Sequence, residues 1–389
     1  MLNFNFQVPT RIIFGRDRIE ELGKEILKYG SRVLLVYGGG SIKQIGLYDR
    51  VIQVLTTSGI SYVELSGIQP NPRITSVRDG VKLCRENGVE LVLAVGGGSV
   101  IDCAKIIAAG VNYEGDPWDF FIHKARITGA LPIGTVLTLA ATGSEMNVNA
   151  VISNEDTGQK LGIGSRHLYP RFSILDPTYT FTVPASQTAA GTADIMSHVF
   201  EQYFSPTPGG FILDRMAEAM LKTCIYYGPI AVAEPNNYEA RANLMWTGTL
   251  ALNGLLSSGR ETDWGVHEIE HVISALYDVT HGVGLAILIP HWMRHVLSER
   301  TAPKLAEYAR RVWDIVGDDD FVVASLGIEK TAAFFRSLGL ATNLREVGVK
   351  ESRLEEMADQ LTANRQPLGA FGQLNRSDVL AILRAAYRG

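Results

Sequence analysis

Short apolar runs alternate with amphipathic stretches in the first half of the chain. Between about Arg32 and Pro184 the runs read RVLLVYGGGS, SYVELSG, ELVLAVGGGS and ALPIGTVLTL, and helical periodicity appears around Tyr48–Thr57 and Thr75–Asn87. Runs this short and this apolar are typical of strands that are buried on both faces. The pattern therefore predicts an α/β domain in which crossover helices cover a parallel sheet.

The pattern changes after Pro184. Segments rich in Ala, Leu and Met follow, such as GFILDRMAEAMLKTCIYYG and TAPKLAEYARRVWDIVG, and β-branched runs become scarce. This texture indicates a domain built from helices. We therefore predict two domains, an α/β domain over residues 1–184 and an all-α domain over residues 185–389.

Composition limits the class of partner and the compartment. The 36 basic and 41 acidic residues are spread along the 389-residue chain and give a net charge of -5, so no basic face for nucleic acid is evident and we expect a small-molecule partner. No apolar run reaches the roughly 18 residues that a membrane helix needs, and the N-terminus has no signal-peptide pattern. We expect no membrane partner and a cytoplasmic location.

Two further features concern cysteines and assembly. Cys84, Cys103 and Cys224 are unclustered and match no C-x-x-C pattern, which disfavours a disulfide framework and a thiolate metal site. The N-terminal segment FQVPTRIIFG has strand character and could pair with the edge of a partner subunit, so we expect a homodimer.

Two apolar runs end in the same Gly-Gly-Gly-Ser sequence. These are residues 38–41 and 96–99, and each is expected to lead from a strand into a helix. Bare backbone N–H groups beside a helix N-terminus attract phosphate. Lys43 and Ile101 stand where the last glycine of G-x-G-x-x-G would be, so the standard fingerprint is absent, and two tight turns that need glycine for positive φ are the alternative. The pair on one sheet favours a dinucleotide site.

A third stretch, TVLTLAATGSEMNVN over residues 135–149, gathers small polar side chains after another run. Hydroxyls and amides in such a place suit a pyrophosphate or a carboxamide, and they equally suit an ordinary helix N-cap region.

Candidate metal ligands gather in the second half. Asp194 and His198 are four residues apart, as are His267 and His271, so on helices each pair faces one side. His281 follows ten residues after the second pair. Apolar neighbours on both sides of Asp194 predict that it is buried, and a buried carboxylate needs a cation. The set favours a metal site over a purely structural network.

The sequence HEIEH over residues 267–271 also matches the H-E-x-x-H signature of zinc proteases. A third ligand at the usual six-residue offset is missing, because His281 lies farther on. A protease would also have little use for glycine-lined nucleotide loops. The facial triad of iron oxygenases fits the ligand types, but those cores are usually β-barrels and this region is helical.

At these motifs the sequence resembles the iron-containing (group III) alcohol dehydrogenase family, in its butanol dehydrogenase and aldehyde reductase branch. The resemblance runs through the whole chain. It is carried by FQVPTRIIFG, YGGGSIKQIG, AVGGGSVIDCAK, LTLAATGSEMN, LDPTYTFTVP, ADIMSHVFE, HEIEHVISALYDVTHG and FGQLNRSDVLAIL.

The resemblance implies the roles of the candidate residues. The first domain would bind the dinucleotide and the second would bind the metal and carry out catalysis. One divalent metal, Fe(II) or Zn(II), would be bound by Asp194, His198, His267 and His281, with His271 beside it and Glu268 a bystander. The cofactor would be bound by Gly96, Gly97, Gly98, Ser99, Asp102, Thr138, Thr142, Asn147, Lys160 and Tyr179, together with the first turn, Gly38, Gly39, Gly40 and Ser41.

The implied chemistry is hydride transfer between a nicotinamide and an aldehyde whose oxygen the metal polarises. His271 is the candidate to supply the proton to the alkoxide. The first glycine turn has no acid to hold ribose hydroxyls, and Ser41 and Lys43 could receive a 2'-phosphate, so we predict NADP(H) over NAD(H).

The expected reaction is therefore an NAD(P)H-linked interconversion of short-chain primary alcohols and aldehydes. A glycerol dehydrogenase-like polyol oxidoreductase and a paralogue that binds metal and nucleotide without catalysis are the alternatives.

Overall fold

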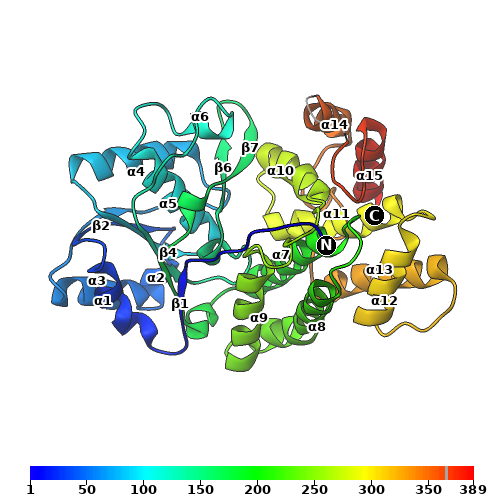
Figure 1. Cartoon of the computed structure of the whole chain (residues 1–389), viewed down its shortest axis with the longest axis horizontal. Coiled ribbons are helices and arrows are strands. Elements are labelled where there is room, and N and C mark those ends of the chain that lie inside the picture. The colour runs from blue at the N-terminus through cyan, green and yellow to red at the C-terminus, as the bar shows by residue number, and fades with distance from the viewer. Residues whose placement is uncertain (364–366) are drawn as a thin grey trace. The chain divides into compact units, whose positions relative to one another are not determined.

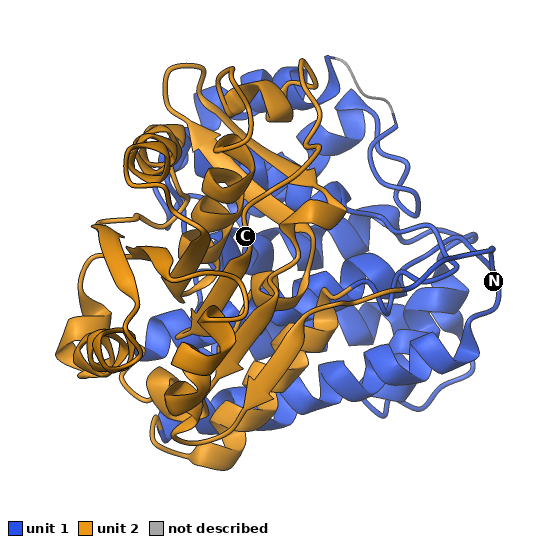
Figure 2. Cartoon of the chain, turned by 60° about the vertical axis from the view of Figure 1, so that its left-hand side comes forward, with its two compact units in different colours: residues 1–6, 184–234, 254–389 blue, residues 7–183, 235–253 orange. Residues whose placement is uncertain are grey.

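A computed structural model describes residues 1–363 and 367–389 of the chain (Figure 1). The chain divides into two compact units (Figure 2). Unit 1 contains residues 1–6, 184–234 and 254–389, and unit 2 contains residues 7–183 and 235–253. The α/β region and the helical region predicted from the sequence are both confirmed.

Unit 2 is built on a six-stranded sheet in which every pairing is parallel, in the order β1-β8-β5-β4-β2-β3. The strands are β1 (Arg11–Phe14), β2 (Arg32–Tyr37), β3 (Ser61–Leu65), β4 (Leu91–Gly96), β5 (Ile133–Leu137) and β8 (Phe172–Leu175). Because the strands are parallel, their carboxyl ends lie at one edge of the sheet. Both glycine turns follow strands at that edge.

Alternating side chains of the strands fill two separate cores. In β2, Leu34 and Val36 belong to the core that also contains residues of α4 and α5, whereas Val33 and Leu35 belong to the core that contains residues of α1 and α3. Figure 1 shows α4 and α5 on one side of the sheet and α1 and α3 on the other. Two buried faces explain why the predicted strands read as continuous apolar runs.

The helices of unit 2 are α1 (Leu22–Ile26), α2 (Ser41–Gln44), α3 (Leu47–Thr57), α4 (Ile74–Glu86), α5 (Gly98–Gly110), α6 (Trp118–Phe121) and α9 (Tyr238–Ala251). An antiparallel pair, β6 (Asn149–Asn154) and β7 (Gln159–Gly164), was not predicted, and neither was β8. The pair carries polar residues and glycine and β8 is only four residues long, so no clear apolar run marked them.

Unit 1 is helical. Its helices are α7 (Ala185–Tyr203), α8 (Phe211–Ala233), α10 (Gly265–Tyr277), α11 (His281–Val296), α12 (Ala302–Val312), α13 (Asp320–Ser337), α14 (Leu354–Thr362) and α15 (Arg376–Arg388). Helix α7 is buried from Thr188 to Tyr203 on all its faces, so it is the central helix of this unit. A helix apolar or small all round is buried in this way.

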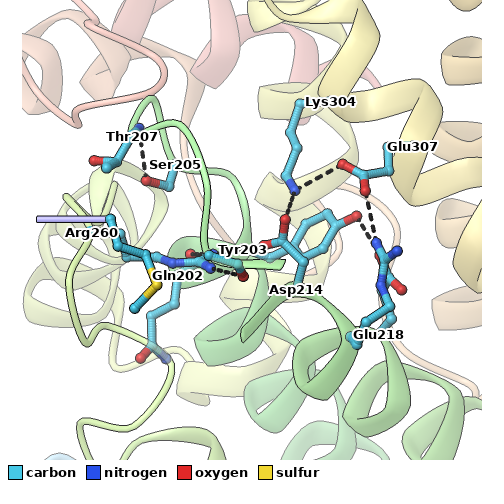
Figure 3. Close-up of polar contacts among 12 residues, drawn as sticks. Gln202, Tyr203, Ser205, Thr207, Asp214, Glu218, Arg260, Lys304 and Glu307 are labelled. Atoms are coloured by element: carbon cyan, nitrogen blue, oxygen red, sulfur yellow. Dashed lines mark hydrogen bonds and ion pairs between the residues drawn. The ribbon is translucent and has the colours of Figure 1, made fainter. Parts of the chain in front are cut away.

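A polar network fixes the C-terminal end of α7 (Figure 3). The Tyr203 hydroxyl donates to Glu218 at 3.0 Å, and Lys304 Nζ donates to Asp214 at 2.7 Å. The Arg260 side chain, only 4% exposed, donates to Asp214 at 2.9 Å and to the Gln202 carbonyl at 3.2 Å. Buried charges that are paired in this way hold neighbouring helices in one register.

The two units and the predicted domains differ in two segments, although both divisions change at Pro184. Residues 1–6 belong to unit 1, where Leu2 N donates to the Gly259 carbonyl. Helix α9 belongs to unit 2, where Thr249 Oγ1 donates to Glu145. Contacts between residues so distant in sequence leave no local pattern. The division at 1–184 and 185–389 as independent domains stays a prediction.

In the part of the chain that the structure describes, no helix has both the length and the apolar character needed to cross a bilayer.

Candidate metal centre and cofactor loops

Helix α7 carries the first two predicted metal ligands. Asp194 and His198 are each 3% exposed, and His198 Nε2 lies 3.7 Å from Asp194 Oδ1. The separation of four residues places both side chains on one face, as predicted. Burial and the neighbouring histidines lower the pKa of His198 well below its usual range, so the imidazole is neutral, which is the form that binds metals.

Helices α10 and α11 supply the other histidines. The His267 ring lies 4.8 Å from that of His198 and 5.3 Å from that of His281, centre to centre, and His281 Nε2 lies 3.7 Å from Asp194 Oδ1. One ligand atom each from Asp194, His267 and His281 lies within 4.8 Å of the others. The structure therefore gathers three of the four predicted ligands into one group, and His198 stacks against it.

Glycines at the start of α11 allow this approach. A Cβ at Gly282 would lie 2.0 Å from the Ala190 carbonyl oxygen, and one at Gly284 would lie 2.8 Å from Glu270 Cγ. Any larger residue would push α11 away from α7 or α10. The motif His-Gly-Val-Gly at residue 281 is thus explained by packing.

Two glutamates that the sequence pattern did not single out contact the histidines. Glu201 Oε1 lies 3.0 Å from His267 Nδ1, and Glu270 Oε2 contacts His281 Nδ1. Glu201 is 2% exposed and Glu270 is fully buried. Both lie inside the motifs ADIMSHVFE and HEIEH, three residues after a histidine, which was the signal available.

These residues fit a divalent metal. His267 Nε2 is buried and has no hydrogen-bond partner among the described residues, and it points away from the Nδ1 atom that Glu201 engages. A buried ring nitrogen of this kind, beside a carboxylate and two further imidazoles, is suited to Fe(II) or Zn(II). The four ligand assignments stay a prediction.

His271 lies beside this group. Its ring is 5.6 Å from that of His281 and 6.4 Å from that of His267, and it forms a second possible group with Glu270 and His281. Glu268 belongs to neither group of possible ligands. The two histidines that would both bind zinc in a protease with this motif, His267 and His271, fall in different groups of possible ligands among the described residues.

The second glycine turn, in unit 2, is tightly packed and leads into a long helix. A Cβ at Gly98 would lie 2.3 Å from Thr142 Oγ1, one at Gly97 would lie 3.2 Å from Leu139, and one at Gly96 would lie 2.5 Å from Val100. Helix α5, 13 residues long, starts at Gly98. The turn at Gly96–Ser99 therefore leads from β4 into a helix, as predicted, and the Thr138 N–H donates to the Gly96 carbonyl. Anion binding at this turn stays a prediction.

The first turn differs from that expectation. Ser41 begins α2, which has only four residues and ends before Gly46 with φ 72°. So short a helix has a smaller dipole than α5, and the positive terminus expected at Ser41 is correspondingly weaker. A Cβ added at Gly39 or Gly40 would have no atom within 4 Å, so a ligand could approach the backbone there. A Cβ added at Gly38 would lie 3.3 Å from the Ile68 carbonyl oxygen, which is a tight contact.

The loop after β5 is held by a buried lysine. Lys105 Nζ, on α5, donates to the Asn147 carbonyl and Oδ1 at 3.0 Å each and to the Asn149 carbonyl at 2.8 Å. Asp102 accepts from Ser144 Oγ at 2.6 Å and from the Val151 N–H at 2.9 Å. Asp102 and Asn147 therefore shape the loop, whatever further contact each makes with a cofactor.

Three other predicted residues lie in different surroundings. Thr142 accepts from the Ser144 N–H at 3.2 Å, within the loop. Lys160 is buried on β7, and Tyr179 is buried after β8, in the core that contains α1 and α3. Burial raises the pKa of the Tyr179 phenol far above its usual range. Their contacts with a cofactor stay predictions.

A cluster of a lysine, two tyrosines and a glutamate surrounds the first turn. Lys43 Nζ lies 4.5 Å from the ring centre of Tyr48 and 5.2 Å from that of Tyr37. The hydroxyls of Tyr37 and Tyr48 donate to Glu64 at 2.6 and 2.8 Å. The hydrogen bond to Glu64, followed by burial, raises the pKa of Tyr48 to about 12. An acid thus stands beside the turn, although it comes from β3 and not from the turn itself.

Comparisons with known proteins agree with the resemblance noted from the motifs. Residues 9–177 match the model described as iron-containing alcohol dehydrogenase, and residues 188–387 match that of the C-terminal part of the same family. The NADH-dependent butanol dehydrogenase A of Clostridium acetobutylicum is 54% identical over 100% of both chains. The NADPH-dependent aldehyde reductase YqhD of Escherichia coli is 43% identical over 93% of each chain.

Solved structures agree as well. The crystal structure of NADH-dependent butanol dehydrogenase A from Thermotoga maritima superposes with a TM-score of 0.95, at 42% identity, covering 100% of this chain and 99% of that one. Identity of this extent over whole chains fixes fold and family together. The chain is an oxidoreductase that belongs to the iron-containing alcohol dehydrogenase family, in its butanol dehydrogenase and aldehyde reductase branch.

Proposed function

We propose that this enzyme is a metal-dependent, NAD(P)H-linked alcohol dehydrogenase and aldehyde reductase that acts on short-chain primary alcohols and aldehydes. The observation that carries the proposal is the convergence of buried Asp194 and His267 with partly buried His281, with His198 stacked against His267. The names of relatives at 43% and 54% identity support the substrate class.

The proposed metal is one Fe(II) or Zn(II) ion bound by Asp194, His198, His267 and His281. When bound, a divalent ion supplies Lewis acidity toward an oxygen atom, and reduced nicotinamide supplies hydride. The residues of the chain then have two tasks. Buried Asp194, His198 and His267 would hold the ion away from bulk water, and His271 would hold the proton that the product oxygen takes.

The dinucleotide is proposed to bind at the carboxyl ends of β2 and β4. Backbone N–H groups of Gly96–Ser99 at the start of α5 would bind its pyrophosphate. The Lys105 and Asp102 contacts keep the loop with Thr138, Thr142 and Asn147 beside this turn.

For the cofactor we propose NADP(H) over NAD(H), as predicted. The support is local: Gly38, Gly39 and Gly40 carry no acid, and Lys43 and Ser41 can meet a 2'-phosphate. NAD(H) is the second candidate, because Glu64 stands beside the turn and the Clostridium relative at 54% identity is named as NADH-dependent. The ratio of kcat/KM for NADPH and NADH with butanal decides between them.

The test of the function is the oxidation of NADPH with butanal by protein stripped of metal with a chelator. Activity should vanish with the metal and return on addition of Fe(II) or Zn(II). Restored protein that binds metal and NADPH but never turns over would overturn the proposal in favour of a non-catalytic paralogue.

Assembly and location stay predictions. A homodimer is supported by β1, which is an edge strand of the sheet and, among the described residues, pairs on one side only, with β8. Light scattering that gives a stable monomer would contradict it. The expected cytoplasmic location rests on the sequence alone.

A further inference from the structure

Two buried carboxylates each engage the Nδ1 atom of one histidine in the proposed metal site. Glu201 Oε1, on α7, accepts the backbone N–H of His267 at 3.0 Å and lies 3.0 Å from the ring Nδ1 of the same residue. Because Glu201 is seven residues after Asp194 and three after His198, it lies on the same face of α7 as these two. One helix therefore places two ligand candidates and the carboxylate that orients a third.

Glu270 is the counterpart on α10. Its Oε2 contacts His281 Nδ1 and its Oε1 contacts the Ser274 hydroxyl, so both oxygens are engaged. The side chain is completely buried, in space that Gly284 leaves open. A carboxylate in such a place has no freedom to turn toward solvent.

These contacts decide which ring nitrogen faces the metal. An ionised carboxylate accepts and cannot donate, so each imidazole must present an N–H at Nδ1. In the neutral imidazole, the form that binds metals, the proton is then absent from Nε2, whose lone pair is free to bind a metal. His281 Nε2 lies 3.7 Å from Asp194 Oδ1, and His267 Nε2 is buried without a hydrogen-bond partner among the described residues, as a ligand atom would be.

Charge points the same way. Asp194, Glu201 and Glu270 are three buried carboxylates gathered around neighbouring imidazoles. Burial of several anions close together is costly, because their desolvation and their mutual repulsion add. A divalent ion in their midst removes much of that cost.

We infer that Glu201 and Glu270 are positioning residues of the metal site, which fix the tautomer and the orientation of His267 and His281 and raise the affinity for a divalent ion. The inference rests on the proposed metal site and assigns functions to two residues outside its ligand set. Removal of partners of this kind typically weakens metal binding about 10- to 100-fold.

The experiment measures Zn(II) affinity by competition with a chromophoric chelator, on protein first stripped of metal. Glu201→Leu and Glu270→Leu remove both the acceptor and the charge and should raise the Kd for Zn(II) by about 100-fold. Glu201→Gln and Glu270→Gln keep an oxygen acceptor and remove only the charge, so about 10-fold is expected. Co(II) is the second probe, because its visible spectrum changes when an imidazole turns.

Glu218→Gln is the matched control. Glu218 is 6% exposed and lies in the same unit, and its partners in the described part of the chain are Tyr203 and Arg215, not a histidine (Figure 3). The control should bind Zn(II) with the affinity of the wild type and give the same Co(II) spectrum.

The outcomes separate the inference from the metal site on which it rests. Wild-type protein that takes up no Zn(II) would overturn the proposed metal site and the inference with it. Wild-type protein that binds Zn(II), with Gln and Leu variants within about threefold of it and unchanged Co(II) spectra, would overturn the inference alone. The wild type could also bind a second Zn(II) ion at Glu270, His271 and His281. Loss of that second ion in Glu270→Gln would make Glu270 a metal ligand and overturn its positioning role. If circular dichroism shows that the Leu variants do not fold, the test is the comparison of the Zn(II) affinity of Glu201→Gln and Glu270→Gln with that of the control Glu218→Gln.

Discussion

Replacement of Lys105 by Met tests whether a buried lysine holds the cofactor loop. The side chain is fully buried, and its ammonium group donates to three oxygens of Asn147 and Asn149 at 2.8 to 3.0 Å. Three donors meet three acceptors, so the protonated form fits the site completely. Methionine has a similar length and no donor.

The size of the effect follows from two opposing terms. Two backbone carbonyls lose their lysine donor, at about 1 to 3 kcal/mol each, whereas Asn147 Oδ1 keeps the Asn149 N–H. The opposing term is the burial of a charge, which lowers the pKa of Lys105 to about 8. Relative to the usual lysine pKa, that shift corresponds to about 3 kcal/mol that the variant regains. We therefore expect a net change between a gain of about 1 kcal/mol and a loss of about 3 kcal/mol in the free energy of unfolding at pH 7, with a loss of about 1 kcal/mol at the centre of this range.

The assay is urea unfolding, with NADPH fluorescence titration on the same samples. Because Lys105 anchors the loop with Thr142 and Asn147, the variant should also bind NADPH about tenfold more weakly, which corresponds to about 1.4 kcal/mol. Lys82→Met is the control, since that lysine is on the same unit with a side chain 72% exposed and a surface ion pair of little value.

The pH dependence has a definite sign. Above about pH 8 folded Lys105 loses its proton while the unfolded chain keeps one up to about pH 10.5. The unfolded state then binds more protons, so the wild type gains stability over Lys105→Met as the pH rises through this window. A variant with unchanged NADPH affinity and no difference from the wild type in the pH dependence of stability between about pH 8 and 10.5 would refute the reasoning.

Three other substitutions have predicted outcomes. His271→Gln should lower kcat for butanal reduction by about 100-fold or more while Zn(II) content stays at the wild-type value; unchanged kcat would remove His271 from proton transfer. Lys43→Ala should lower the kcat/KM ratio of NADPH to NADH by about tenfold, and an unchanged ratio would show that Lys43 does not meet a 2'-phosphate. Arg260→Met should cost about 3 kcal/mol in urea unfolding, because it leaves Asp214 with Lys304 as its remaining cation; a loss under about 1 kcal/mol would contradict a tight pairing.

The fold was predictable where local pattern and burial coincide. β2, β4 and β5 lie inside the sheet with neighbours on both sides, and their apolar runs identified them. β8 lies between β1 and β5 but has only four residues, FSIL, so its run was too short to separate from loop. Residues 1–6 belong to unit 1 and residues 235–253 to unit 2 because of contacts with residues far away in the sequence. No local sequence pattern records such contacts.

The two glycine turns illustrate a limit of motif reasoning. Both read Gly-Gly-Gly-Ser, and on sequence they were interpreted alike. The helices after the two turns differ in length: α5 continues for 13 residues, whereas α2 ends after four because Gly46 adopts a positive φ of 72°. A positive φ favours glycine and interrupts a helix, so the glycine downstream carried the information that the triplet did not.

In the metal site, spacing predicted the candidate ligands but not the carboxylates that contact them. Spacing predicted that Asp194 and His198 share a face, because four residues make about one helical turn. Glu201 and Glu270 have spacing as regular, three residues after a histidine, but a glutamate on a helix is usually a solvated residue, so spacing alone favoured no role for them. Their distinguishing property is burial, and at Glu270 that burial goes with the close approach of α11 at Gly284, where an added Cβ would meet the Glu270 side chain. A glycine in the first turn of α11 is therefore the sequence feature that favours a buried carboxylate at position 270, whereas the sequence has no comparable feature for Glu201.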